Sequence, residues 1–183
     1  SCTSCCKDDD ATKENGVIWK SRICGNDLIG DVGLGYPIYN KTVVFHSTPV
    51  PGDDDENSII YGLDTETGKE KWRLTNADFA PKKDLRLNCT FGTYQKNNIL
   101  IACDDVYTPM RPNGERYIYS IDIEKGKVMW ITKLPNEYWS MGYIIKGAGK
   151  YAYVNATSDN KISLLRVDIE TGELSSAIDI VSK

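Results

Sequence analysis

A twelve-residue pattern that occurs three times constrains the fold of this chain more than any other feature of its sequence. The three copies are Tyr61–Trp72, Tyr119–Trp130 and Leu165–Ser176. In each copy an aspartate precedes a glycine by four residues, and the shared positions are Asp64, Gly68, Trp72, Asp122, Gly126, Trp130, Asp168 and Gly172, with Ser176 in place of a third tryptophan. The pattern stays constant while the loops between copies differ in length, which is typical of a repeat protein.

A second marker recurs in parallel with the first. A glycine and an aromatic or threonine residue precede a short apolar run three times, at Gly35-Tyr36, Gly92-Thr93 and Gly142-Tyr143. Turn residues divide each repeat into four strand-sized segments, which in the third repeat are 139–146, 151–157, 162–169 and 173–180. The motif aspartate is suited to accept bonds from backbone amides, and the motif glycine supplies the positive φ that a tight hairpin needs. The sequence therefore predicts an all-β fold.

The motif also carries a family resemblance. Leu63-Asp64-x-x-Thr67-Gly68-Lys69-x-x-Trp72 resembles the repeat of PQQ-like, or quinoprotein-type, β-propellers. The resemblance implies a β-propeller-type array of about three four-stranded antiparallel blades, in which the tryptophan of one blade packs against the next. The expected blades are about 33–75, 88–134 and 138–180, within a propeller-type domain that spans 16–183.

Two features of this array depart from the family pattern. Asn15-Gly-Val-Ile-Trp19 looks like the end of a further repeat, so we expect one extra strand beside the three blades. Propellers close their ring with about 4–8 blades, so we expect the ring to be incomplete within one chain. The chain is then part of a larger protein, one half of an assembly, or an open arc. The third copy of the motif has Ser176 in place of a tryptophan, which indicates a terminal repeat.

The amino terminus has a different composition. Residues 1–15 are polar and acidic without periodicity, which predicts a disordered tether. Ser1-Cys2 followed by this run resembles the mature start of a bacterial lipoprotein, and Cys6 with its three following aspartates resembles the acidic tag of Bacteroidetes-type surface lipoproteins. The resemblance implies acylation at Cys2, with Cys5 and Cys6 as alternatives. We therefore expect an outer-membrane lipoprotein, periplasmic or surface-exposed, whose only contact with the membrane is its N-terminal lipid.

Charge and composition exclude several classes of function. The net charge of −4 and the pI of about 5.1 disfavour nucleic-acid binding, and a single histidine, His46, disfavours multi-histidine metal sites and a histidine-based triad. His46 follows an apolar run and is expected to be structural. The acidic loop with Asp53, Asp55 and Asn57 alternates like a calcium loop but lacks its later glycine and glutamate. We expect a solvated hairpin tip there, and no cofactor.

The cysteines of the body leave their pairing open. Cys89 and Cys103 lie on neighbouring predicted strands, and Cys24 precedes the first repeat. A bridge between Cys89 and Cys103 requires that the hairpin register place them on one face. Buried free thiols are the alternative.

These observations favour a membrane-anchored, non-enzymatic binding or scaffolding module, whose partner is another protein or a second copy of the chain. One alternative is a fragment of a PQQ-dependent dehydrogenase, although the family's enzymes place their cofactor in a closed ring beside calcium ligands. The other is glycan binding by aromatic residues near the glycine-marked strands: Tyr36, Tyr39, Tyr94, Tyr138, Trp139 and Tyr143. Packing between blades is the favoured role for these aromatics.

Overall fold

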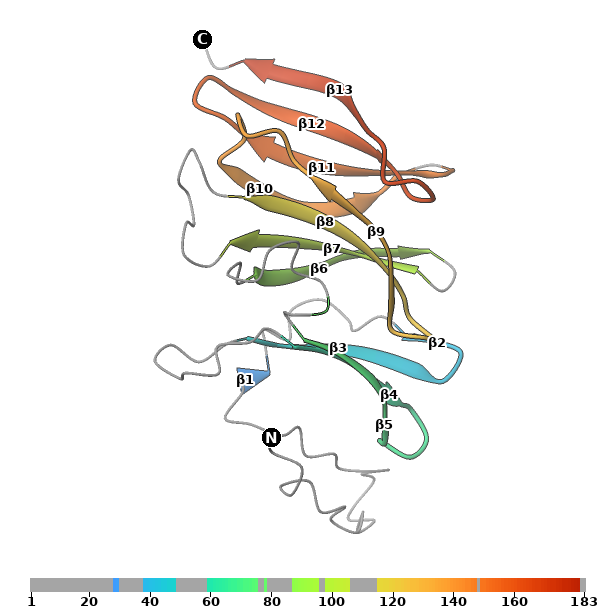
Figure 1. Ribbon diagram of the computed structural model, residues 1–183. Coiled ribbons are helices and arrows are strands. Elements are labelled where there is room, and N and C mark those ends of the chain that lie inside the picture. Colours follow the sequence, from blue (N-terminus) through green and yellow to red (C-terminus); the bar gives the residue numbers. More distant parts are fainter. Residues whose placement is uncertain are drawn as a thin grey trace, which may run out of the picture.

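Three antiparallel β-sheets, stacked one above another, make up the computed structural model of this chain (Figure 1). The structure describes residues 28–29, 38–48, 59–75, 78, 87–95, 98–105, 115–147 and 149–181. Within these ranges the strands are β1 (Leu28–Ile29), β2 (Ile38–Tyr39), β3 (Thr42–Thr48), β4 (Ile59–Asp64), β5 (Glu70–Thr75), β6 (Leu87–Gln95), β7 (Asn98–Asp105), β8 (Arg116–Asp122), β9 (Lys127–Lys133), β10 (Ser140–Lys146), β11 (Tyr151–Thr157), β12 (Lys161–Asp168) and β13 (Leu174–Val181). We name the sheets blade 1 (β1–β5), blade 2 (β6–β9) and blade 3 (β10–β13).

Blades 2 and 3 are four-stranded, and their strands pair in chain order. In blade 3 the strand bounds agree with the sequence prediction to within one residue, and β11 coincides with it. The first strand of each of these blades is interrupted by a bulge, between Phe91 and Tyr94 in β6 and between Met141 and Ile144 in β10. The second sequence marker falls on these bulges. At Gly142 an added Cβ would meet Asn155 Oδ1 at 2.1 Å, so a larger residue there would require the Asn155 side chain to move.

Blade 1 differs from the expected four-stranded repeat. Its first position is shared by two short strands, β1 and β2, which both pair with β3. The sequence between them holds three glycines and Pro37, residue types that disfavour a continuous strand. A tight turn joins β2 to β3 through Asn40 and Lys41, which both have positive φ and fit the twist of a two-residue hairpin.

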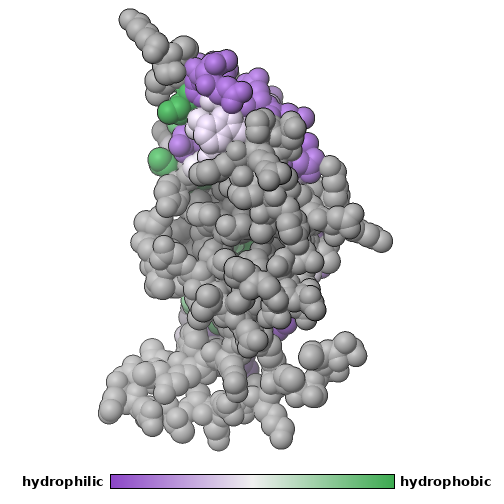
Figure 2. Space-filling model, turned by 90° about the vertical axis from the view of Figure 1, so that its left-hand side faces the viewer, coloured by the Kyte–Doolittle hydropathy of each residue, from purple (hydrophilic) through white to green (hydrophobic). Residues whose placement is uncertain are grey.

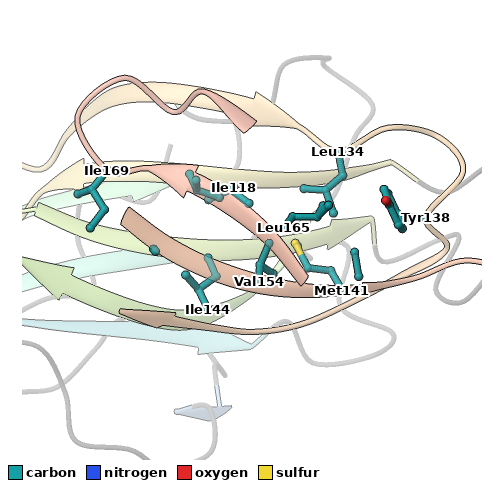
Figure 3. Close-up of a cluster of buried hydrophobic side chains, with 11 residues drawn as sticks. Ile118, Leu134, Tyr138, Met141, Ile144, Val154, Leu165 and Ile169 are labelled. Carbon is teal, nitrogen blue, oxygen red and sulfur yellow. The ribbon is translucent and has the colours of Figure 1, made fainter. Parts of the chain in front are cut away.

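The core lies between the blades rather than within any one sheet. All seven residues of β8 are buried, because this strand has a blade on each side. Its alternating side chains divide between two clusters: Tyr117, Tyr119 and Ile121 pack with blade 1, while Ile118 packs with blade 3. Figure 3 shows the second cluster, in which Ile118 of β8 and Val154 of β11 contribute to one apolar layer. The described residues thus confirm the all-β array with three blades.

Several sequence predictions fall outside the described residues and stay predictions. These are the tether with Cys2, Cys5 and Cys6, the extra strand at 15–19, Cys24, the loop with Asp53, Asp55 and Asn57, and Tyr36. In the part of the chain that the structure describes, no helix has the length and apolar character needed to span a bilayer.

Candidate binding surface

The motif aspartate organises the turn that joins the last two strands of each blade. In blade 1, Asp64 Oδ1 accepts hydrogen bonds from the amide of Glu66 at 3.0 Å and from the amide and hydroxyl of Thr67 at 2.8 and 2.9 Å. The amide of Gly68 donates to the Asp64 carbonyl at 2.8 Å, and Gly68 has a φ of 69°. The aspartate and the glycine therefore close one compact turn, as the sequence predicted.

Blades 2 and 3 build the same turn. Asp122 Oδ1 accepts hydrogen bonds from the amides of Glu124 and Lys125, two and three residues later, at 2.9 and 3.0 Å. Asp168 Oδ1 accepts from the equivalent amides at 2.9 and 3.2 Å, and its Oδ2 pairs with Lys150 Nζ at 2.6 Å. The turn of blade 3 is thus also tied to the β10–β11 connection.

These bonds lower two carboxyl pKa values. The amide and hydroxyl of Thr67 hold the pKa of Asp64 below its usual range, and the Lys150 ammonium, followed by backbone amides, does the same for Asp168. A carboxyl with a depressed folded pKa stabilises the fold above its unfolded pKa of about 3.9, and this contribution is lost as the pH falls through the folded pKa.

We therefore expect the free energy of unfolding to decrease as the pH is lowered from about 5 to about 3. Denaturant unfolding at a series of pH values measures this slope. In the double variant Asp64→Asn/Asp168→Asn, whose side chains at these positions no longer titrate, the slope becomes shallower. An unchanged slope in the double variant would contradict the assignment.

The motif tryptophan joins each blade to the next. Trp72 of β5 donates its Nε1–H to the carbonyl of Ile123, in the turn of blade 2, at 2.8 Å. Its ring lies between two glycines: an added Cβ would come within 2.2 Å of the indole at Gly62 of its own blade and within 2.3 Å at Gly126 of the next. Shape and hydrogen bonding together fix how blade 2 sits on blade 1.

Trp130 repeats this contact between blades 2 and 3. Its Nε1–H donates to the carbonyl of Ile169 at 3.0 Å, and a Cβ at Gly172 would lie 2.6 Å from the ring. Thr132, two residues along β9, donates its hydroxyl to the carbonyl of Gly172 at 2.7 Å. The family resemblance implied this packing, and the geometry confirms it for both tryptophans.

Blade 3 replaces the tryptophan with a different pair of residues. In the other two blades the tryptophan lies opposite a small residue: Trp72 lies opposite Gly62, and Trp130 lies opposite Ser120. In blade 3 the position of this small residue is taken by Arg166, which lies opposite Ser175. The alignment that put Ser176 at the tryptophan position was wrong by one residue, because the bulge of the last strand comes later in β13 than in β5 or β9.

The Arg166 guanidinium fills the place where a small residue leaves room for an indole in the other blades. It lies over the Tyr151 ring at 4.5 Å, and its Nε donates to Ser175 Oγ at 3.1 Å. Sequence reasoning passed over Arg166, although its alignment with Gly62 and Ser120 was a visible signal.

We define the outer face as the side of blade 3 that points away from blade 2, and we assign to it Ile145, Tyr153, Leu164, Arg166 and Ile178. The register places Leu164 opposite Ile178. The equivalent pairs are Ile60 with Leu74 in blade 1 and Ile118 with Thr132 in blade 2.

Burial is lower on the outer face, where Leu164, the equivalent of Ile60 and Ile118, is half-buried. Ile60 and Ile118 are 1 % and 0 % exposed, because a following blade covers them. On the outer face Ile178 is 58 % exposed and Ile145 64 %. Figure 2 shows apolar side chains beside strongly polar ones at the blade 3 end of the molecule. The outer face thus has the apolar character of a blade-stacking surface and is open to solvent.

A family model supports the assignment of the repeats. The model described as outer membrane protein assembly factor BamB matches residues 56–175, which include all three copies of the motif turn. The chain belongs to this family. No curated protein matches the chain.

Two solved structures are similar to this chain at low identity. Quinohemoprotein alcohol dehydrogenase from Comamonas testosteroni shares 18 % identity with a TM-score of 0.48, over 79 % of this chain and 28 % of that one. BamB from Moraxella catarrhalis shares 14 % identity with a TM-score of 0.30, over 81 % of this chain and 49 % of that one. The chain therefore spans less than half the length of either protein.

A hollow lined by both polar and apolar side chains borders blade 3 on the side toward blade 2. It has a volume of about 340 Å³ and lies between the β9–β10 connection and strands β12 and β13. Tyr138 donates its hydroxyl to Ser163 Oγ at 3.0 Å, Ser163 donates to Asp179 Oδ1 at 2.7 Å, and Lys161 Nζ pairs with Asp179 Oδ2 at 3.0 Å. The Ser163 hydroxyl and the Lys161 ammonium lower the pKa of Asp179. The network is held together by these contacts, and Lys161 Nζ also lies 3.6 Å from Glu137 Oε1.

The remaining candidates of the sequence are distributed rather than gathered. Tyr138 is buried in the core beside blade 2, which agrees with packing, whereas Tyr39 is exposed on β2. His46 pairs with Ile60 between β3 and β4. Among the described residues, no three His, Cys, Asp or Glu side chains gather as a metal site.

The hairpin register left open by the sequence is set in blade 2. Cys89 of β6 and Cys103 of β7 are direct partners in the antiparallel pair. Direct partners of such a pair have Cα atoms about 4.5–5.5 Å apart, which lies within the range that a disulfide requires.

Proposed function

We propose that this chain is a non-enzymatic protein-binding module, held at the outer membrane by an N-terminal lipid, and that its outer face docks a partner protein. The observation that carries the proposal is the exposure of Ile178 and Ile145 on the outer face. In contrast, Leu74, at the position of Ile178 in blade 1, and Ile60 and Ile118, at the position of Leu164 in blades 1 and 2, are buried. The description of the family as an outer membrane protein assembly factor supports the general setting. Acylation of Cys2 is part of the proposal.

The kind of partner follows from the stacking that the chain already contains. Twice, the equivalent surface packs against a twisted four-stranded sheet, so the outer face fits a sheet of similar twist with apolar side chains. Arg166 adds a cation where the internal interfaces have Gly62 and Ser120. A carboxylate on the partner is the complementary group, and it distinguishes this contact from the stacking of one blade on the next.

A photo-crosslinking residue in place of Ile178 tests the proposal in the native envelope. Met129 is the matched control, because it is 53 % exposed but lies on β9, outside the outer face. We expect one defined protein adduct from position 178, none from position 129, and loss of the adduct in the Arg166→Glu background.

With the crosslinked protein purified, Ile178→Glu is expected to weaken binding at least tenfold, by about 1.4 kcal/mol, while Met129→Glu leaves the affinity unchanged. An adduct with the mass of two copies of the chain would identify self-association as the contact. Equal labelling from both positions, or no adduct from position 178, would refute a docking role for the outer face.

A further inference from the structure

Two cysteines of blade 2 stand directly opposite each other on its first two strands. Cys89 of β6 pairs with Cys103 of β7, and the register is regular from Leu87 to Phe91, so the bulge of β6 begins only after this stretch. Direct partners in an antiparallel pair share one face of the sheet, and their Cα atoms lie about 4.5–5.5 Å apart. The backbone therefore meets both requirements of a cross-strand disulfide, a common face and a Cα separation of about 4.4–6.8 Å.

The next strand shows toward which blade this face points. Cys103 is also the direct partner of Tyr117 on β8, so the three positions form one row across the sheet. Tyr117 is 4 % exposed and packs in the cluster between blades 1 and 2. The cysteine pair therefore lies on the face of blade 2 that points toward blade 1.

The equivalent pair in blade 3 occupies a buried position. Tyr117 and Ser163 both precede the motif aspartate of their repeat by five residues. Ser163 pairs with Ala156, and Ala156 pairs with Met141. Met141 and Ala156 are 9 % and 0 % exposed, in the cluster between blades 2 and 3. The cysteine pair thus stands at a place in the repeat that the stacking of blades encloses.

Only the observed register brings the two cysteines to one face. A shift of one residue would place Cys89 opposite Ala102 or Asp104 and would turn it to the other face relative to β7. β6 stands at one end of the strand order of blade 2, so within its sheet it is held by β7 alone (Figure 1). A covalent link here would fix the edge strand in register beside its bulge.

We propose that Cys89 and Cys103 form a cross-strand disulfide that fastens β6 to β7. One thiolate attacks a disulfide oxidant such as oxidised glutathione and displaces a thiol, and the second thiolate attacks this mixed disulfide and displaces the other thiol. The chain gives up two protons and two electrons, which leave in the two thiols of the oxidant. The envelope location in the proposed function would supply such an oxidant, but the pairing rests on the register and is independent of the outer face.

Mapping the disulfide in the purified full chain tests the proposal. The folded chain is equilibrated with oxidised glutathione, its free thiols are alkylated, and it is digested with trypsin without reduction. Trypsin cuts after Lys96, between the two cysteines, so the bridge links peptide 87–96 to peptide 97–116. We expect this linked pair as the main product, and reduction should separate it. Alkylated Cys89 and Cys103, or a bridge from either to another cysteine, would overturn the proposal.

A variant with one cysteine moved by a single position is the matched control. Ala102→Cys/Cys103→Ala keeps the number of cysteines but places the moved one opposite Thr90, on the other face of the pair. We expect no linked peptide from this variant under the same conditions. A linked peptide in equal yield would show that the register does not direct the pairing.

Unfolding with and without dithiothreitol measures the fastening itself. A bridge that closes a loop of about 15 residues should shift the unfolding equilibrium toward the folded state by about a hundredfold. Cys89→Ser/Cys103→Ser cannot form the bridge, so dithiothreitol should leave its unfolding unchanged. An equal response of both proteins to dithiothreitol would assign the stabilisation to other cysteines and overturn the fastening of β6.

Discussion

Replacing Trp130 by alanine is expected to lower the free energy of unfolding by about 3–5 kcal/mol, the range for truncating a large aromatic ring at a packed site. The variant leaves a cavity between Ser120 and Gly172 and removes the hydrogen bond to the Ile169 carbonyl. Denaturant unfolding followed by circular dichroism measures the loss. Met129→Ala, at the exposed neighbouring position, should change stability by less than about 0.5 kcal/mol.

The conservative variant Trp130→Phe separates packing from hydrogen bonding. It keeps an aromatic ring over Gly172 but has no N–H for the Ile169 carbonyl, so it should recover most of the packing and lose about 0.5–1.5 kcal/mol. A loss below about 1 kcal/mol for Trp130→Ala would mean that the tryptophan does not hold the two blades together.

Gly172→Ala is expected to be the second most damaging substitution, at about 2–5 kcal/mol, because two costs add. Alanine is strained at a φ of 76°, and its Cβ would lie 2.6 Å from the Trp130 ring and from Thr132 Oγ1. The same unfolding experiment measures the effect.

Gly149→Ala is the matched control for this position. Gly149 has a similar φ of 66°, but no heavy atom lies within 4 Å of its added Cβ. It therefore reports the backbone strain alone, about 1–2 kcal/mol. Equal losses for Gly172→Ala and Gly149→Ala would show that contact with the tryptophan contributes nothing.

The periodic part of the fold could be predicted from the sequence because each repeat carries its own local signals. Asp168 and Gly172 fix a turn through bonds within five residues, so the strands on both sides follow. The register of β13 could not be predicted in the same way. Its bulge falls between Ser176 and Ile178, and the position of a bulge depends on which side chains pack on each face rather than on a local motif.

The candidate site was less predictable for a related reason. Leu164 is as apolar as Ile60 and Ile118 and stands at the same place in its repeat, so nothing local distinguishes it. How far Leu164 is buried depends on what packs against its face, which is a property of the whole array. The split first position of blade 1 is similar: glycines and Pro37 indicate a break, but only the pairing with β3 shows that two strands share the position.

The acceptor for each interblade tryptophan is a main-chain carbonyl, at Ile123 and at Ile169, and every amino acid supplies one. A unit that keeps the aspartate turn and its glycine can therefore make this contact with any neighbour that keeps the indole, whichever residue supplies the carbonyl. Gene duplication or recombination can then lengthen or shorten such a protein by whole units without a compensating change in the tryptophan contact.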